Sequence, residues 1–276
     1  MKIHLVAIDL DGTLLNSAKQ ITETTAAILR TARLEAGVHI VLASARPPRS
    51  VLPFYTLLDL DAPMINYNGA LVYDPPSRRV LMHRPIAAGT ALEIVSIARK
   101  MHPEVLVSGE ILDQWFTDHL DPAYLTETAR IFKPDLVAPI EQWLTQPITK
   151  LLLLGEPDRL VEIAAAVGRR FQHQVSMVQT DEQLLQIMHA TVSKAQALRV
   201  VAGELGVQRE QVMAIGDNAN DVGMLQWAGV GVAMANASPE VLEVADYVTD
   251  HHDADGAAKA IRDIILEGLP PERRKR

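Results

Sequence analysis

The first candidate for chemistry is an acidic pair near the start of the chain. Asp9 and Asp11 follow the apolar run Ile3–Ile8, which has the length and composition of a buried strand. Residues two positions apart point to the same side of extended backbone, so both carboxylates can face one crevice. Gly12 allows a sharp turn there. The alternative is an acidic turn in which an aspartate caps a helix, although DLDGT at a strand end is more specific than a lone acidic pair.

A second pair of acids lies near the other end of the chain. Asp217 and Asp221 occur in the segment GDNAND, directly after the apolar run Val212–Ile215. Acids supplied by two strand ends suit a hard divalent cation, because Mg²⁺ prefers oxygen ligands and typically binds a couple of carboxylates together with phosphate and water. The alternative is a solvated turn with an aspartate capping the following helix.

Two further residues have the chemistry of phosphate ligands. Ser44 ends the apolar run Val38–Ala43, and its hydroxyl can donate to a phosphate oxygen or cap a helix that starts near Pro47. Lys194 stands at the expected start of a helix, where the helix dipole disfavours a cation. A functional role such as neutralising a phosphate explains that position, and an ordinary surface lysine is the alternative.

The elements that must position these residues alternate along the chain. Strand-like runs occur at Ile3–Ile8, Val38–Ala43, Met64–Tyr67, Val212–Ile215 and Val230–Ala233. Helices are expected at 22–36, from Pro47, and at about 193–205, 221–228 and 255–267. This alternation predicts βαβ units and therefore an α/β fold with a parallel sheet, whose strand ends form the usual ligand site.

The middle of the chain has a different character. Two short apolar runs at 70–73 and 80–83 predict a hairpin that leads out of the sheet. Beyond it we expect an inserted α/β domain over 84–187, with helices at 88–101 and 158–170 and strands at 149–154, 174–178 and 184–188. Residues 1–83 and 188–276 then form the catalytic core. Trp115 and Trp143 in the insert are candidates for a pocket lining or for core packing.

Composition narrows the class of protein. The 276 residues contain no cysteine, which excludes disulfides and thiolate chemistry, and the formal charge of −8 argues against nucleic acid as a partner. No apolar stretch is long enough to span a membrane or to serve as a signal sequence, so we expect a cytoplasmic protein. The basic tail Arg273–Arg276 is expected to be a solvated end.

Taken together, the motifs resemble those of the haloacid dehalogenase-like (HAD) superfamily. DLDGT, a hydroxyl residue at the next strand end, a lysine and GDxxND follow one another in the order typical of that superfamily. Three further segments resemble its Cof-type branch, namely Ile215–Ala237, Asn68–Ala70 and Asp255–Gly256. The resemblance implies a Rossmann-like core with an inserted C2-type α/β cap that determines substrate specificity.

The resemblance also implies roles for the acids. Asp9 is expected to be the nucleophile and a Mg²⁺ ligand, and Asp11 the general acid and base, with its backbone carbonyl on the metal. Asp217 is expected to bind Mg²⁺. Asp221 is expected to support the metal site, either as a ligand or through the residues around it.

The remaining candidates concern the phosphate and the substrate. The resemblance implies that Ser44 and Lys194 bind the transferring phosphoryl group and that Asn220 contacts phosphate. Arg46 is a possible contact for the substrate or the cap, with a surface salt bridge as the alternative. Asn68 is a possible substrate contact, and its alternative is a type I′ turn formed with Gly69.

These observations predict a Mg²⁺-dependent phosphatase of small phosphorylated metabolites, such as sugar phosphates or phosphorylated cofactors, acting through an aspartyl-phosphate. Two alternatives stay open: a phosphotransferase with the same intermediate, and a catalytically silent sensor of phosphorylated ligands. The expected partner is a small phosphorylated molecule, and the protein is either a monomer or a homodimer.

Overall fold

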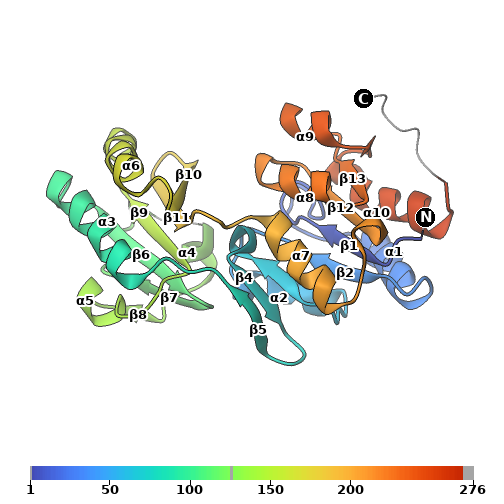
Figure 1. Ribbon diagram of the computed structural model, residues 1–276, viewed down its shortest axis with the longest axis horizontal. Helices are drawn as coiled ribbons and strands as arrows, with labels where there is room; N and C mark the ends of the chain where they lie inside the picture. Colours follow the sequence, from blue (N-terminus) through green and yellow to red (C-terminus); the bar gives the residue numbers. More distant parts are fainter. Residues whose placement is uncertain (1, 125–126, 270–276) are drawn as a thin grey trace. The chain divides into compact units, whose positions relative to one another are not determined.

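Short apolar runs form the buried strands of a parallel sheet in the computed structural model, which describes residues 2–124 and 127–269. The central strand β1 (Leu5–Ile8) pairs with β12 (Val212–Gly216) on one side and β2 (His39–Leu42) on the other. β13 (Val230–Ala233) and β14 (Tyr247–Val248) complete the order β14-β13-β12-β1-β2 (Figure 1). Segments from the two ends of the chain therefore lie side by side in one sheet.

Helices cover both faces of this sheet. One face packs against α1 (Glu23–Leu34), α2 (Pro48–Leu57) and α10 (Gly256–Ile261). The other packs against α7 (Lys194–Glu204), α8 (Val222–Trp227) and α9 (Pro239–Val244). Because strand side chains alternate, Val6 and Ile8 enter the first hydrophobic cluster and Leu5 and Ala7 the second. The predicted α/β class with a parallel sheet is confirmed.

A small antiparallel sheet follows the second βα unit. β3 (Met64–Asn66), β4 (Leu71–Asp74) and β5 (Arg79–His83) form it in that order, which matches the hairpin expected over 70–83. The connection from β3 to β4 contains Asn68 in the left-handed conformation, with φ of 55°. Asn68 therefore takes part in a tight turn, as one of its two interpretations predicted.

The insert contains a six-stranded sheet in the order β10-β11-β9-β6-β7-β8. All neighbours are antiparallel except β7 and β8. The strands are β6 (Leu106–Ile111), β7 (Gln114–Thr117), β8 (Leu136–Val137), β9 (Lys150–Leu154), β10 (Val175–Asp181) and β11 (Leu184–His189). The helices of the insert are α3 (Ala88–Met101), α4 (Glu127–Ile131), α5 (Ile140–Trp143) and α6 (Pro157–Phe171). α3, α5 and α6 share one hydrophobic core with the sheet, and Trp143 belongs to that core.

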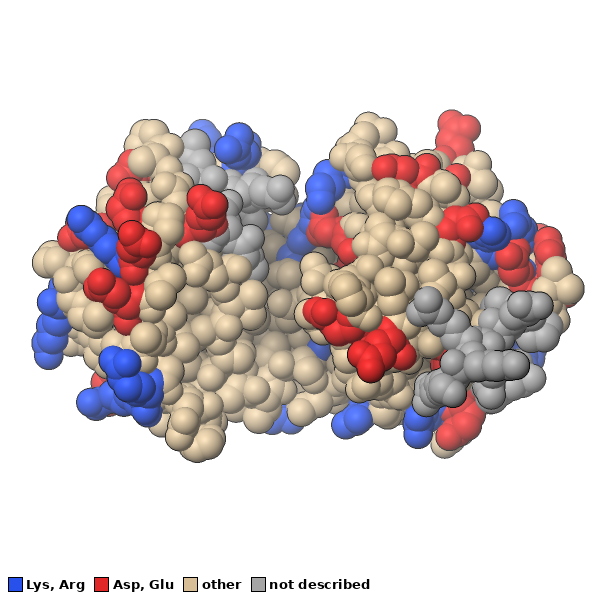
Figure 2. Space-filling model, turned by 90° about the horizontal axis from the view of Figure 1, so that it is seen from above, with Lys and Arg blue, Asp and Glu red and all other residues tan. Residues whose placement is uncertain are grey.

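The chain divides into two compact units, of which the second is His83–Val192 and the first takes the residues before and after it. The second unit extends past the predicted end at 187, because β11 runs to His189 and the Ala190 N–H donates to the Gln174 carbonyl. None of the helices in the described ranges combines the length and hydrophobicity needed to cross a bilayer. On the face shown in Figure 2, acidic and basic side chains are interspersed over each unit, as is typical of a solvated surface. The basic tail lies outside the described residues.

Candidate active site

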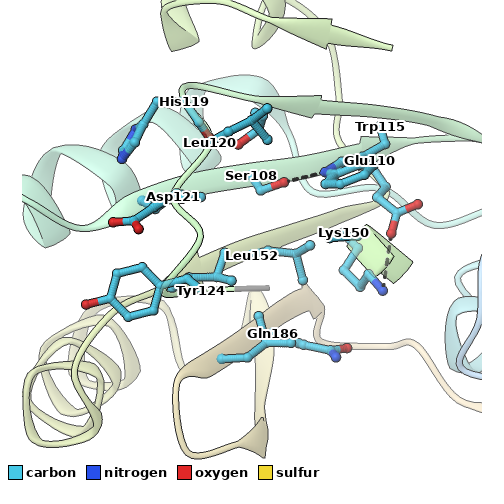
Figure 3. Close-up of a pocket in the computed structure, with 15 residues that line it drawn as sticks. Ser108, Glu110, Trp115, His119, Leu120, Asp121, Tyr124, Lys150, Leu152 and Gln186 are labelled. Atoms are coloured by element: carbon cyan, nitrogen blue, oxygen red, sulfur yellow. Dashed lines mark hydrogen bonds and ion pairs between the residues drawn. The ribbon is translucent and has the colours of Figure 1, made fainter. Parts of the chain in front are cut away.

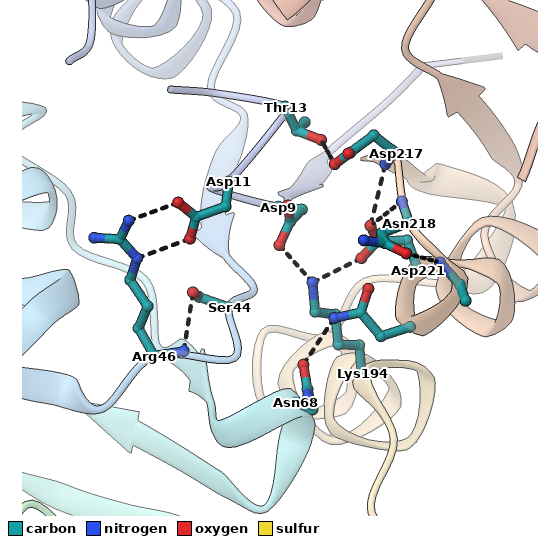
Figure 4. A network of polar contacts seen from close by, with 12 residues as sticks. Asp9, Asp11, Thr13, Ser44, Arg46, Asn68, Lys194, Asp217, Asn218 and Asp221 are labelled. Carbon is teal, nitrogen blue, oxygen red and sulfur yellow. Dashed lines mark hydrogen bonds and ion pairs between the residues drawn. The ribbon is translucent and has the colours of Figure 1, made fainter. Parts of the chain in front are cut away.

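The site lies where three neighbouring strands of the parallel sheet end. Asp9 directly follows β1, Asp217 directly follows β12, and Ser44 lies two residues beyond β2. Because β12, β1 and β2 are adjacent and parallel, their carboxyl ends meet at one edge of the sheet. Figure 4 shows these side chains gathered around one region with Lys194, which enters from the start of α7.

Lys194 forms two buried hydrogen bonds at the centre of the site. Its Nζ donates to Asp9 Oδ1 at 2.5 Å and to Asp221 Oδ1 at 2.7 Å. The residues are 1%, 6% and 0% exposed, respectively, so all three groups are removed from water. Lys194 is the first residue of α7, where Ser193 caps the helix by accepting from the Gln196 N–H. The two carboxylates explain why a lysine is stable at a helix start.

The charges of this cluster do not balance. Oxygen atoms of Asp9, Asp217 and Asp221 lie within 4.8 Å of one another, and Lys194 is the cation that contacts two of them. Burial and the neighbouring carboxylates raise the pKa of Asp9 well above its usual value, although Lys194 opposes this. Burial also raises the pKa of Asp217. Excess negative charge in a buried place creates a demand for a cation.

The loop after β12 is organised by Asp221. Its Oδ2 accepts from the backbone N–H groups of Asp217 and Asn218, both at 3.1 Å. The hydroxyl of Thr13 donates to Asp217 Oδ1 at 2.8 Å. Gly12 has φ of +81°, and a Cβ there would lie 2.4 Å from Asp217 Oδ2. Glycine is therefore required both by the backbone conformation and by the close approach of the two acidic loops.

Asp11 lies apart from this carboxylate cluster. Arg46 binds it with two hydrogen bonds, from Nε to Oδ2 at 2.8 Å and from Nη2 to Oδ1 at 2.6 Å, and Lys19 Nζ donates to Oδ1 at 2.7 Å. Partial burial alone would raise the pKa of Asp11, but the contacts with Arg46 and Lys19 outweigh it and lower that pKa. The structure thus contains a salt bridge of Arg46, which is one of its two predicted alternatives.

Asn68 connects Ser44 and Asn220 through hydrogen bonds. The Ser44 carbonyl accepts from the Asn68 N–H at 3.0 Å, and Asn220 Nδ2 donates to Asn68 Oδ1 at 2.9 Å. Ser44 is buried, and its hydroxyl accepts from the Arg46 N–H at 3.1 Å. The helix cap considered for Ser44 is not observed, because α2 begins at Pro48 with Pro47 as its N-cap. Phosphate binding by these residues stays a prediction.

Sequence reasoning missed Thr13 and Lys19. Thr13 belongs to the DLDGT segment, so its closeness to Asp9 was a signal that a hydroxyl stands beside the acids. Lys19 gave no such signal, because its contact with Asp11 depends on a loop in which Lys19 itself has φ of 58°. Thr13 orients Asp217, and Lys19 adds a second cation beside Asp11.

Comparison with known proteins identifies the family to which this arrangement of residues belongs. The model of the haloacid dehalogenase-like hydrolase family matches residues 6–261. The chain belongs to this family. The protein YxeH of Bacillus subtilis is 33% identical over 95% of this chain and 98% of its own length. A 5-amino-6-(5-phospho-D-ribitylamino)uracil phosphatase of the same organism, YitU, is 28% identical over 95% of this chain and 97% of its own.

Solved structures agree with this family. A haloacid dehalogenase-like hydrolase from Bacteroides thetaiotaomicron superposes with a TM-score of 0.88 at 29% identity, over 96% of this chain and all of its own. The predictions of the HAD superfamily with its Cof-type branch, of the α/β core with an additional α/β insert, and of an enzyme of the phosphatase type are thereby confirmed.

Proposed function

We propose that the chain is a Mg²⁺-dependent phosphatase that hydrolyses small phosphorylated metabolites through an aspartyl-phosphate on Asp9. The observation that carries the proposal is the position of Asp9. It directly follows the central strand, contacts Lys194 at 2.5 Å and lies beside the carboxylates of Asp217 and Asp221. A nucleophilic carboxylate, a cation and a metal-binding set are the components that phosphoryl transfer requires.

The donor set fits Mg²⁺. Asp9 and Asp217 offer hard oxygen ligands, as Mg²⁺ prefers. Asp221 already accepts three hydrogen bonds, from Lys194 and from two backbone N–H groups, so we assign it to orienting the loop. The backbone carbonyl of Asp11 stays a predicted further ligand. When bound, Mg²⁺ would supply the missing positive charge and screen the anionic oxygens of the substrate.

We assign a separate catalytic role to each of the residues at the site. Asp9 attacks the phosphorus in line, forming the aspartyl-phosphate as the bond to the leaving oxygen breaks. Lys194 stabilises the negative charge that spreads over the phosphoryl oxygens. Asp11 donates a proton to the leaving alkoxide and later takes one from the attacking water, which contributes typically ~10²–10⁴-fold. Ser44 and Asn220 are proposed to hold the phosphoryl oxygens.

The second unit is proposed to act as the cap that determines substrate specificity. The substrate is proposed to be a small phosphorylated molecule, and the function of YitU makes a phosphorylated ribityl compound a reasonable member of a test panel. A cytoplasmic location stays a prediction from the sequence.

Phosphate release from p-nitrophenyl phosphate and a panel of sugar and cofactor phosphates tests the proposal. We expect free phosphate in the presence of Mg²⁺. A phosphorylated acceptor in place of free phosphate would identify a phosphotransferase instead. Tight binding of panel members without turnover would identify a sensor.

Removal of the metal should abolish activity. Chelation with EDTA is expected to stop phosphate release, because it removes the cation that the carboxylates of Asp9 and Asp217 are proposed to hold, and added Mg²⁺ should restore it. The measurement is the rate of phosphate release before chelation, after it and after Mg²⁺ is added back. Full activity in EDTA would contradict the metal site.

The pH profile should depend on Arg46. Since the hydrogen bonds and charge of Arg46 lower the pKa of Asp11, Arg46→Leu should raise that pKa. Protonated Asp11 then persists to higher pH, so the loss of activity with rising pH should shift upward. The assay uses an alkyl phosphate such as glycerol 2-phosphate, whose leaving group needs a proton.

Arg33→Leu is the matched control, because Arg33 pairs with Asp59 at 2.6 Å in the same unit. An unchanged pH profile together with a higher KM in Arg46→Leu would instead assign Arg46 to substrate binding.

A further inference from the structure

The second unit contains a cavity of about 80 Å³ that is lined by residues of its six-stranded sheet (Figure 3). Trp115 lines this cavity, and its indole N–H donates to Ser108 Oγ at 2.6 Å. Lining a pocket is one of the two roles predicted for Trp115. The cavity belongs to the unit already proposed to determine substrate specificity.

A separate cluster of polar side chains joins the two ends of the chain within the first unit. Asn236 Nδ2 donates to the Gly12 carbonyl at 2.8 Å, and Asn236 Oδ1 accepts from the His252 N–H at 3.1 Å. His252 Nδ1 lies 2.9 Å from the Leu15 carbonyl oxygen. Because a carbonyl can only accept, Nδ1 carries a proton and donates it in this contact.

Asp253 holds the next part of the same loop. Its Oδ1 accepts from the Ser17 N–H and its Oδ2 from the Ser17 hydroxyl, both at 2.7 Å. These hydrogen bonds lower the pKa of Asp253, so its carboxylate is ionised at neutral pH and both oxygens can accept. Asn236, His252 and Asp253 together form a clamp that holds the 12–20 loop at three successive points.

The 12–20 loop depends on such contacts for its position. It consists of turns without a helix or strand of its own, and Gly12 and Lys19 have φ of +81° and 58°. A lysine in the left-handed region is uncommon and persists where the surrounding structure holds it. Leu14 and Leu15 anchor the loop in the hydrophobic core, and the clamp supplies contacts to its polar backbone.

The loop determines where two functional groups of the site lie. Asp11 directly precedes it, and Thr13 within it donates to Asp217 Oδ1 at 2.8 Å (Figure 4). A shift of the loop backbone would therefore move the carboxylate of Asp11 and the contact with Asp217 together. A misplacement of about 1 Å in an active site can cost about 10²-fold in rate.

A purely structural role is the alternative for this part of the chain. The residue that follows the clamp closely, Asp255, holds the start of α1, since its Oδ1 accepts from the hydroxyls of Thr22 and Thr25 at 2.6 and 2.9 Å. These two contacts lie beyond the 12–20 loop. They therefore provide a reference for hydrogen bonds of the same segment that stabilise a helix.

We infer that the clamp positions Asp11, by holding the 12–20 loop where Asp11 can protonate the leaving group. The inference rests on the proposed function, in which Asp11 is the general acid. The residues of the clamp act through the backbone carbonyls of Gly12 and Leu15 and through Ser17, so they are positioning residues and need no contact with the substrate.

Kinetics with two esters test this inference. His252→Phe keeps a ring but removes the N–H, and Asp253→Ala removes both acceptors for Ser17. Thr25→Val is the matched control, because it removes a hydrogen bond between the same segment and α1. Glycerol 2-phosphate has an alkyl leaving group that needs a proton, whereas p-nitrophenyl phosphate releases a phenolate that is stable without one.

Both clamp variants should lower kcat/KM for glycerol 2-phosphate by about tenfold or more, and for p-nitrophenyl phosphate by less than about twofold. A smaller fraction of folded protein lowers both values equally, so the ratio of the two reports the position of Asp11 and not stability. In an Asp11→Asn background, His252→Phe and Asp253→Ala should leave this ratio unchanged, because the group that they position is absent. Thr25→Val should leave it unchanged in both backgrounds.

Amide hydrogen exchange separates this inference from the proposed function, because it requires no turnover. Exchange at residues 12–17 should be faster by about fivefold or more in both clamp variants than in wild type and Thr25→Val. If wild type hydrolyses neither ester, the phosphatase proposal fails, and faster exchange still supports the anchoring of the loop. Unchanged exchange, or an active clamp variant whose ratio of kcat/KM values stays within twofold of wild type, would overturn the inference.

Discussion

Replacing Asp9 by asparagine should reduce phosphate release by about 10⁴-fold or more, as loss of a nucleophile typically does. Asparagine has the shape of aspartate but cannot form the acyl-phosphate bond. The fold should survive, because Lys194 retains Asp221 as a partner at 2.7 Å. Release of phosphate from p-nitrophenyl phosphate, measured with Mg²⁺ for both proteins, gives the ratio.

The same substitution should not lower stability in metal-free buffer. Burial raises the pKa of Asp9 in the folded protein above its unfolded value, so ionised Asp9 weakens the fold as pH rises above that unfolded value, about 4. Asparagine removes this effect, and the thermal midpoint at pH 7 should equal or exceed that of wild type. Asp61→Asn, at an exposed position of the same unit, is the control for activity. Near-normal turnover by folded Asp9→Asn would refute the nucleophile.

The core of the fold was predictable because its signals are local. Asp9 and Asp217 each follow a short apolar run. An apolar run followed by acids identifies both a strand and a candidate site residue at its carboxyl end, without knowledge of the neighbouring strands. The register that brings them together, Ile8 opposite Ile215, joins strands from the two ends of the chain. The alternating elements predict a parallel sheet but not this pairing. The position of Lys194 was also indicated locally, since a lysine at a helix start requires a nearby anion.

The second unit was less predictable because its strands are defined by distant contacts. β6 contains Gly109 and Glu110, which weaken strands by propensity and interrupt the apolar pattern. Gly109 is needed there because a Cβ would lie 2.3 Å from Ile148 Cδ1. Glu110 is buried beside Lys150, which lies far along the chain. No segment of sequence read alone contains these constraints, so β6 was not among the strands predicted for the insert.

Lys194→Met should lower both activity and stability. Burial alone would lower the pKa of Lys194, but Asp221 and Asp9 outweigh it and raise that pKa. Protonated Lys194 therefore stabilises the fold fully at every pH below the pKa of lysine in the unfolded chain, about 10.4. Neutral pH lies within this range. Loss of the ammonium leaves buried carboxylates without their partner, which typically costs about 3–5 kcal/mol. Loss of a charge that stabilises the transition state should reduce kcat by about 10²–10³-fold.

Chemical denaturation at pH 7 with EDTA, and again with Mg²⁺, tests this cost and its cause. If excess negative charge weakens the variant, Mg²⁺ should recover more stability in Lys194→Met than in wild type, because the cation compensates the same carboxylates. Lys259→Met is the matched control, since Lys259 pairs with Asp250 at 2.6 Å in an exposed position where an ion pair contributes about 1 kcal/mol or less. A Lys194→Met protein that is as stable and as active as wild type would remove both the electrostatic and the catalytic role of this lysine. If the variant is destabilised and Mg²⁺ does not rescue it, the result would support the stabilising role of the ion pair in wild type. It would also indicate that the metal binds away from Asp9 and Asp217.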